Sequence, residues 1–346
     1  MEYAALAEKR NSLFGVLAGD MEERFVLPMT KALRDGGWSL DDLNHYAQAL
    51  HAPDFNRMIA EARGGREAPG RQPLGGYETD LLSALEDDGW AGKGLSDAKA
   101  KETVEWFERQ AGADKLREAA SYLVFMNRRI LDQRVADGLM ARQQAETWKK
   151  LSPYYVPLRT MQEAEEGDIA APAGRNLSSR EIKRAVGHFG ALNENSVVNS
   201  LTQMDAALYR GLINKERQNL WRFLEANPDP DSYVLHETVP TREVKVRNAD
   251  GTFTVQQQVD QGFVRKASPQ DKEGTIVPVK FDGEVKYIEF KGVNARTAAR
   301  AVKENALQGR AFAALPFIRG LGHMFKGVRT IYAVDFMLRN GQSDGL

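Results

Sequence analysis

The chain contains no cysteine among its 346 residues. Disulfide bonds, a thiol nucleophile and cysteine-based zinc or iron–sulfur sites are therefore excluded. A long uncharged apolar run is also lacking, because the most apolar region, Ala311 to Leu338, is interrupted by a proline, an aspartate and several basic residues. An ordinary transmembrane helix needs about 20 nearly uncharged residues. The N-terminus lacks the basic region and apolar core of a secretory signal, so we expect a protein without export by that route.

Recognisable catalytic spacings are missing too. His236-Glu237 begins like a zinc-protease motif, but the second histidine one helical turn later is absent. Gly89 to Gly94 lacks the spacing and the hydroxyl residue of a phosphate-binding loop, and Gly320-Leu321-Gly322 sits inside a helical pattern rather than after a strand. The remaining histidines are scattered, so we expect surface or hydrogen-bonded side chains. The sequence predicts no metal site, no cofactor and no enzymatic activity.

Charge is distributed unevenly along the chain. The segment from Lys291 to Asn340 has nine Lys or Arg residues and two acidic residues, a net charge of +7, whereas residues 1–290 sum to −7. A near-neutral total therefore hides a polarised molecule. Such a segment could meet nucleic acid, an anionic membrane or an acidic partner.

A helix expected from Val293 to Ala306 would place Arg296, Arg300 and Lys303 on one face, because they are spaced at i, i+4 and i+7. With Arg310 they form a candidate nucleic-acid site, which would act through phosphate contacts. An ordinary solvated face is the alternative, since no aromatic residues are interleaved to stack on bases.

A second C-terminal helix is expected from Phe312 to Leu338, with its basic residues close to one face. Leu321, Phe325 and Tyr332 lie on the apolar side and form a candidate interaction surface. Packing against a core is the favoured interpretation, and an interfacial membrane helix is the alternative.

Most of the chain before Asn227 has helical periodicity. Helices are expected over residues 4–34, over 40–63 with Ser39 and Asp42 as a capping box, over 99–110, over 114–151 and over 193–226. The segment 64–76 is rich in Gly and Pro and is expected to be a long loop, followed by a short helix near 78–87.

After Pro230 the periodicity changes to two. Residues 233–247 and 252–265 are expected to be strands on either side of Asn248 to Gly251. The pair 276–281 and 284–290 flanks Asp282-Gly283, which suits a two-residue type I′ turn. We therefore predict a predominantly helical α+β fold: a helical array, a small antiparallel sheet of about four strands, and C-terminal helices. The expected organisation is a helical domain over 1–160, an acidic and Ala/Pro/Gly-rich linker over 161–178, and a second unit over 179–340.

Several short motifs occur in the same order as in the large polyvalent proteins of phages and other mobile elements, and the chain resembles in particular the associated domain of their C-terminal region. The residues that carry the resemblance are Tyr46 to Arg57, Gly94 to Ala100, Tyr154 to Arg159, Glu225 to Asp229, the strand pair around Asp282-Gly283, and Val334 to Asn340. Two features depart from the family: Pro157-Leu158 is followed by Arg159-Thr160-Met161 rather than by a PLxRFG motif, and the sequence ends soon after the last segment.

The resemblance implies a non-enzymatic scaffold or interaction module that accompanies element DNA into a host cell while other modules do the chemistry. Its partners would be other modules of a larger polyvalent protein or virion components, and its location the virion or the bacterial host cytoplasm. The alternatives are a nucleic-acid-binding module that uses the basic C-terminal helix face and a membrane-active delivery segment.

Overall fold

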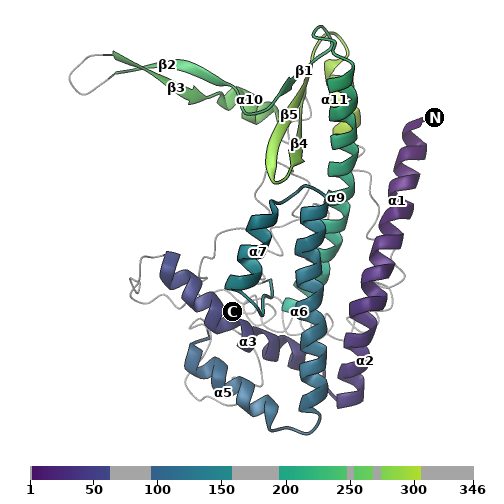
Figure 1. Cartoon of the computed structure of the whole chain (residues 1–346), viewed down its shortest axis with the longest axis vertical. Helices are drawn as coiled ribbons and strands as arrows, with labels where there is room; N and C mark the ends of the chain where they lie inside the picture. The colour runs from purple at the N-terminus through teal and green to yellow at the C-terminus, as the bar shows by residue number, and fades with distance from the viewer. Residues whose placement is uncertain (1, 63–94, 158–194, 248–252, 268–273, 305–346) are drawn as a thin grey trace, which may run out of the picture.

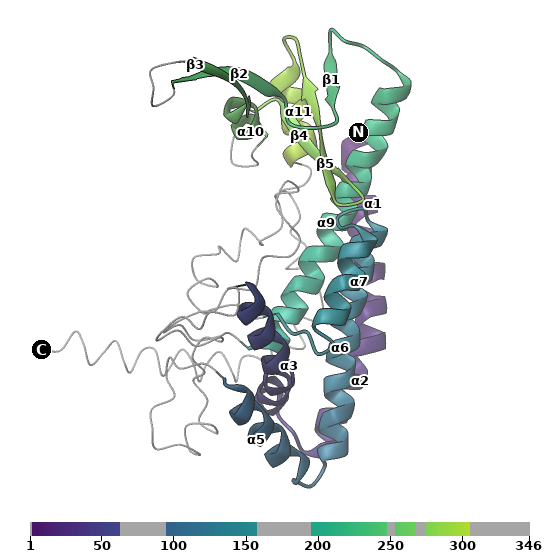
Figure 2. The same cartoon turned by 60° about the vertical axis from the view of Figure 1, so that its left-hand side comes forward.

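The computed structural model describes residues 2–62, 95–157, 195–247, 253–267 and 274–304. These residues are mainly helical with small antiparallel sheets (Figure 1), which confirms the predicted α+β class. The helices form an elongated body, the sheets lie at one end of it, and a two-stranded arm projects from that end in both views (Figures 1 and 2).

The first helical segment is nearly continuous. Helix α1 (Glu2–Met21) passes through a π-helical stretch, η1 (Glu22–Val26), into α2 (Leu27–Gly36). This segment ends at the left-handed Gly37, slightly beyond the end expected at Arg34. Helix α3 (Leu40–Ala62) begins with the predicted capping box. The backbone N–H of Ser39 donates to Asp42 Oδ2 at 2.8 Å, and the N–H of Asp42 donates to Ser39 Oγ at 3.1 Å.

Helix α5 (Asp97–Glu108) corresponds to the helix expected over 99–110. The prediction of one helix over 114–151 is wrong, because two helices, α6 (Ala113–Ala136) and α7 (Arg142–Leu151), occupy this range. The break lies at Gly138, whose φ of 70° is in the left-handed region that ends helices. Apolar residues still recur at helical spacing beyond Gly138, because Ala145 of α7 packs against Leu131 of α6 and Met140 of the connecting turn.

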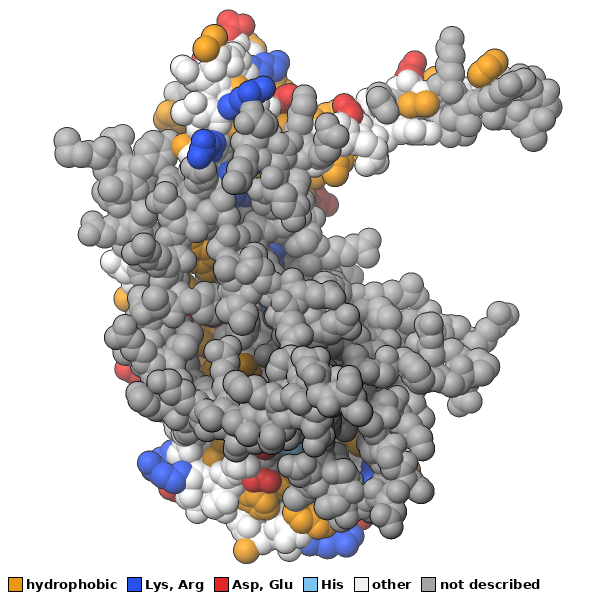
Figure 3. Space-filling view, turned by 180° about the vertical axis from the view of Figure 1, so that it is seen from behind, with side chains coloured by type: hydrophobic (Ala, Val, Ile, Leu, Met, Phe, Trp, Pro, Cys, Tyr) orange, Lys and Arg blue, Asp and Glu red, His pale blue; other side chains and the backbone are white. Residues whose placement is uncertain are grey.

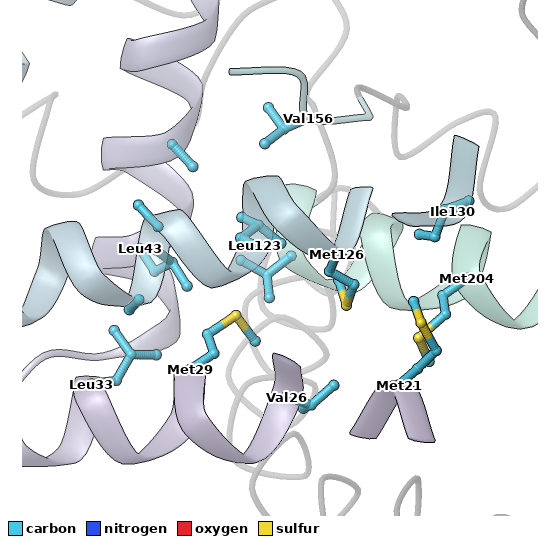
Figure 4. Packing of buried hydrophobic residues seen from close by; sticks show 14 of the residues in the cluster. Met21, Val26, Met29, Leu33, Leu43, Leu123, Met126, Ile130, Val156 and Met204 are labelled. Atoms are coloured by element: carbon cyan, nitrogen blue, oxygen red, sulfur yellow. The ribbon is translucent and has the colours of Figure 1, made fainter. Parts of the chain in front are cut away.

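Helix α9 (Ser196–Ala226) is the longest helix in the described residues, and Asn195 caps it by accepting from the N–H groups of Val197 and Val198. Its first half belongs to the large hydrophobic core shared by α1, η1, α2, α3, α5 and α6; Figure 4 shows part of this core. We call these helices, with α9, the stem. Residues 161–178 lie outside the described residues, so the predicted domain boundary stays a prediction, although the stem contains helices from both sides of it.

The strands form two separate sheets. One has the order β1-β5-β4 and consists of β1 (Tyr233–His236), β4 (Ile276–Phe281) and β5 (Glu284–Phe290); the other pairs β2 (Thr241–Arg247) with β3 (Phe253–Val259). Both are antiparallel. Asp282 and Gly283 have φ values of 50° and 85°, which confirms the tight β4–β5 hairpin with a turn of the primed kind.

Two strand boundaries differ from the prediction. The strand expected over 233–247 divides at residues 237–240, so that β1 joins β5 while β2 joins β3; Pro240 in this gap has no N–H to donate to a ladder. The strand expected over 252–265 ends at Val259. Asp260 then caps α10 (Gln261–Lys266) by accepting from the N–H of Gly262 at 2.9 Å.

The three-stranded sheet is covered on both faces. Trp221 and Leu224 of α9 and Ala299 of α11 (Ala295–Glu304) pack against Val277 and Ile288 on one face. A second cluster, from α10 and the other face, contains Phe263, Ala267, Ile276 and Tyr287. The sheet is therefore held between the end of the stem and α10.

Candidate interaction site

A buried polar joint fixes the sheet to the stem. The Asn214 side chain of α9 donates from Nδ2 to the carbonyl oxygens of Asp137 (2.8 Å) and Lys280 (2.9 Å), and its Oδ1 accepts from the Lys280 N–H at 2.8 Å. One turn later, Gln218 Nε2 donates to the Lys280 carbonyl at 2.6 Å. Two amide side chains of α9 thus bind the α6–α7 turn and strand β4 at the same point.

The Asp137 carboxylate forms the charged part of the joint. It is almost fully buried, accepts from Gln133 Nε2 at 3.0 Å on both oxygens, and pairs with Lys215 Nζ at 2.7 Å. The residue of α9 beneath it is Gly211, where any Cβ would overlap the carboxylate. A buried carboxylate with these partners is a structural element, because its acceptor capacity is used within the joint.

The backbone of the β4–β5 turn closes the joint. The N–H of Gly283 donates to the carbonyl of Gly138 at 3.0 Å. Nearby, Arg217 Nη1 donates to the carbonyl of Pro278 at 2.9 Å, and burial lowers the pKa of the Arg217 guanidinium to about 10. The hairpin is therefore held by side chains and by main chain.

The base of the arm is packed through aromatic rings. Phe263 of α10 lies edge-on between His236 (ring centroids 5.0 Å apart) and Tyr287 (5.3 Å). His236 Nε2 is 2.8 Å from Glu289 Oε2, so this histidine is hydrogen-bonded. Burial raises the pKa of the Tyr287 phenol. The chain segments that lead into and out of the arm are thus anchored on the three-stranded sheet.

The arm itself, strands β2 and β3, exposes apolar side chains. Phe253, Val255 and Val259 of β3 are 66%, 58% and 44% exposed. They share one face of the ribbon because strand side chains alternate, and Figure 3 shows hydrophobic side chains on the arm well away from the body. The alternating pattern predicts a strand here, and the apolar residues that alternate along it without any charged residue are the signal by which this face can be recognised from sequence.

The predicted nucleic-acid residues are placed only in part. Arg296 and Arg300 of α11 are exposed, whereas Lys303 is 7% exposed and its Nζ donates to the carbonyl of Gly274 at 2.9 Å. The structure therefore does not bring three cations together on one exposed face. Arg310 lies outside the described residues, as do the predicted interaction residues Leu321, Phe325 and Tyr332 and the helix expected over 312–338.

His51 and Ser152 form a buried pair that superficially resembles a base and a nucleophile. His51 Nδ1 lies 3.1 Å from Ser152 Oγ, and the imidazole packs beside the rings of Phe55 and Tyr155. Burial lowers the pKa of His51 to about 3, so the ring is neutral at physiological pH. Both side chains are enclosed by the protein, and this histidine is hydrogen-bonded, as the sequence led us to expect.

Neither a metal site nor a membrane span stands out in the part of the chain that the structure describes. No group of three or more His, Asp or Glu side chains there is arranged to bind a metal ion. None of the helices described is both long enough and apolar enough to traverse a bilayer. Comparison with protein families, with curated proteins and with solved structures gave no match.

Proposed function

We propose that this chain is a non-enzymatic scaffold and interaction module of a phage or mobile-element polyvalent protein, and that its arm is a contact element. The observation that carries the proposal is the exposure of Phe253, Val255 and Val259 on a ribbon that projects from a well-packed body. The mobile-element context rests on the sequence resemblance. So do the role of accompanying element DNA into a host cell and the location in the virion or the bacterial host cytoplasm.

The form of the arm supports a binding role. A two-stranded hairpin is at best marginally stable alone in water, yet this one is anchored through Phe263 and the His236–Glu289 hydrogen bond at its base. An ordered, apolar and projecting element is already in the shape it needs for a partner, which reduces the entropic cost of binding. Clustered apolar side chains on a surface are typical of protein–protein contact sites.

The experiment is co-purification of the full chain from cells that also express the neighbouring genes of its element. We expect element proteins to co-purify with the wild type and to be lost with Phe253→Ser/Val255→Ser, while the far-UV circular-dichroism spectrum is unchanged because both side chains are exposed. Val264→Ser, on the exposed side of α10, is the matched control and should retain the partners. Equal recovery with the arm variant and the control would contradict the proposal.

Nucleic-acid binding through α11 is the second candidate, favoured by the exposure of Arg296 and Arg300 one helical turn apart. If each contacts one phosphate, the logarithm of the binding constant should fall with that of salt concentration with a slope of about −1.8. Arg296→Glu/Arg300→Glu should abolish binding, and Arg222→Glu, an exposed arginine of α9, should leave it intact. Failure of DNA and RNA to bind at low salt would eliminate this candidate.

The membrane-surface alternative concerns the segment Phe312 to Leu338. Those residues lie outside the described ones, so this alternative stays a prediction.

A further inference from the structure

The two edges of the arm differ in charge. Strand β2 has the sequence TREVKVR, with four charged residues, whereas β3 has the sequence FTVQQQV, with none. Charged residues on an edge strand discourage pairing with another chain, and an uncharged alternating strand permits it. The edge of β3 that faces away from β2 pairs with no other strand of the described residues. The arm therefore has one protected edge and one open edge.

We propose that the open edge of β3 pairs antiparallel with β3 of a second copy of this chain, giving a four-stranded sheet with the order β2-β3-β3-β2. This inference rests on the proposed function, since it assigns the arm its first partner. A two-fold axis through Gln256 generates the pairing, and two-fold symmetric contacts are the commonest form of self-association.

The strand is complementary to itself in that register. Phe253 lies opposite Val259 of the second copy, and Val255 lies opposite Gln257 of the second copy. Val255 is also diagonal to Val255 and Val259 of the second copy, within reach of side-chain contact. The three exposed apolar residues of each copy thus meet their counterparts, and no like charges face one another because β3 has no charge.

The shape of the molecule allows the second copy to approach. The arm points away from the stem in both ribbon views (Figures 1 and 2). Since its base is fixed by α10 and the three-stranded sheet, the edge is presented without prior rearrangement. Backbone hydrogen bonds would supply affinity and the alternating side chains would set the register, as in other cases of strand addition.

The absence of native cysteine makes a direct test possible. In the proposed register the two copies of residue 256 face each other with Cα atoms about 4.5–5.5 Å apart, which suits a disulfide. Gln256→Cys should therefore form a covalent dimer on mild oxidation of the full chain. Gln258→Cys should not, because its two copies would be about 14 Å apart along the strands. Val244→Cys, at the centre of β2, should also stay uncrosslinked.

Sedimentation equilibrium gives the second measurement. The molar mass measured for the wild type should be twice the chain mass of 38.6 kDa. Val255→Lys should weaken the dimer by roughly a factor of ten or more, because two like charges then lie diagonal across the pair. Val264→Lys, a similarly exposed valine outside the strand, should leave the dimer unchanged.

A wild type that stays monomeric at the highest soluble concentration would overturn the inference. Crosslinking through residue 244 instead of residue 256, or a dimer unaffected by Val255→Lys, would also overturn it. Each of these results leaves the proposed function to its own co-purification test, because a monomeric arm can still bind other proteins of the element.

Discussion

Asn214 is the residue at which the joint can be tested most sharply. Asn214→Ala removes two donated hydrogen bonds and one accepted hydrogen bond in a single substitution. The Lys280 carbonyl keeps its bond from Gln218 Nε2 at 2.6 Å, but the Lys280 N–H loses the Asn214 Oδ1 acceptor. A buried donor without a partner costs about 1–3 kcal/mol, and each lost hydrogen bond contributes about 1 kcal/mol. We expect the free energy of unfolding to fall by about 2–4 kcal/mol.

The control for this change is Asn219→Ala, five residues along the same helix. Asn219 is exposed, and its Oδ1 accepts from Arg222 Nη1 at 3.2 Å on the surface. Both variants gain the same helix propensity from alanine, so the difference between them isolates the joint. Asn219→Ala should change the free energy of unfolding by about 0.5 kcal/mol or less.

Urea denaturation followed by circular dichroism measures the loss of stability, and hydrogen exchange locates it. The amides of β4 and β5 should exchange faster in Asn214→Ala, whereas those in the first half of α9 should change least, because they belong to the stem core. A difference of less than about 0.5 kcal/mol between the two variants, or an equal loss of protection in the stem and the sheet, would refute the role assigned to Asn214.

Two further predictions concern packing and pH. Gly211→Ala should destabilise the protein by about 2 kcal/mol, because its Cβ would overlap the buried Asp137 carboxylate. Gly15→Ala, with no atom within 4 Å of the added Cβ, should stabilise the protein by about 0.5–1 kcal/mol. Thermal melts of the two variants would show whether their effects have opposite signs. Burial raises the pKa of Asp205 from 3.8 to about 6 and lowers that of His51 from 6.5 to about 3, so the native state binds more protons than the unfolded state at Asp205 and fewer at His51. Stability contributed through Asp205 is lost as pH rises from about 4 to about 6, and stability contributed through His51 is lost as pH falls from about 6.5 to about 3. The two effects oppose each other between pH 4 and 6, so Asp205→Asn should steepen the loss of stability on acidification and His51→Gln should lessen it, by up to about 1.4 kcal/mol per pH unit. Urea midpoints between pH 4 and 6 that keep the wild-type slope in both variants would be incompatible with these shifts.

Local chemistry made part of this fold predictable from sequence. The Ser39–Asp42 capping box and the Asp282–Gly283 turn each depend on residues within four positions of one another, so their signals are complete in a short window. The break at Gly138 was missed because the apolar period continues on both sides of it. The end of β3 was missed because Asp260, which starts α10, was not recognised as a cap.

The joint was not predictable by the same means. Asn214 is 77 residues from Asp137 and 66 from Lys280, and both of its donated bonds end on carbonyl oxygens, which leave no trace in side-chain identity. On a helix, a buried amide and an exposed amide have the same sequence signature. Similarly, the helical period predicts that Lys303 lies beside Arg296 and Arg300 on one face. In the structure the Lys303 ammonium is buried instead, and it donates to the carbonyl of Gly274, a residue outside the helix.

Helix α9 has a mechanical consequence. Its 31 residues extend for about 46 Å at 1.5 Å per residue, with one half embedded among the stem helices and the other beneath the sheet. Because a single unbroken rod belongs to both cores, a load applied to the arm is transmitted through the sheet and the joint along the helix axis into the stem. The stem and the sheet should therefore behave as one rigid body under tension. Force applied between the arm and the stem would break the hydrogen bonds of the joint before it unwound helix α9.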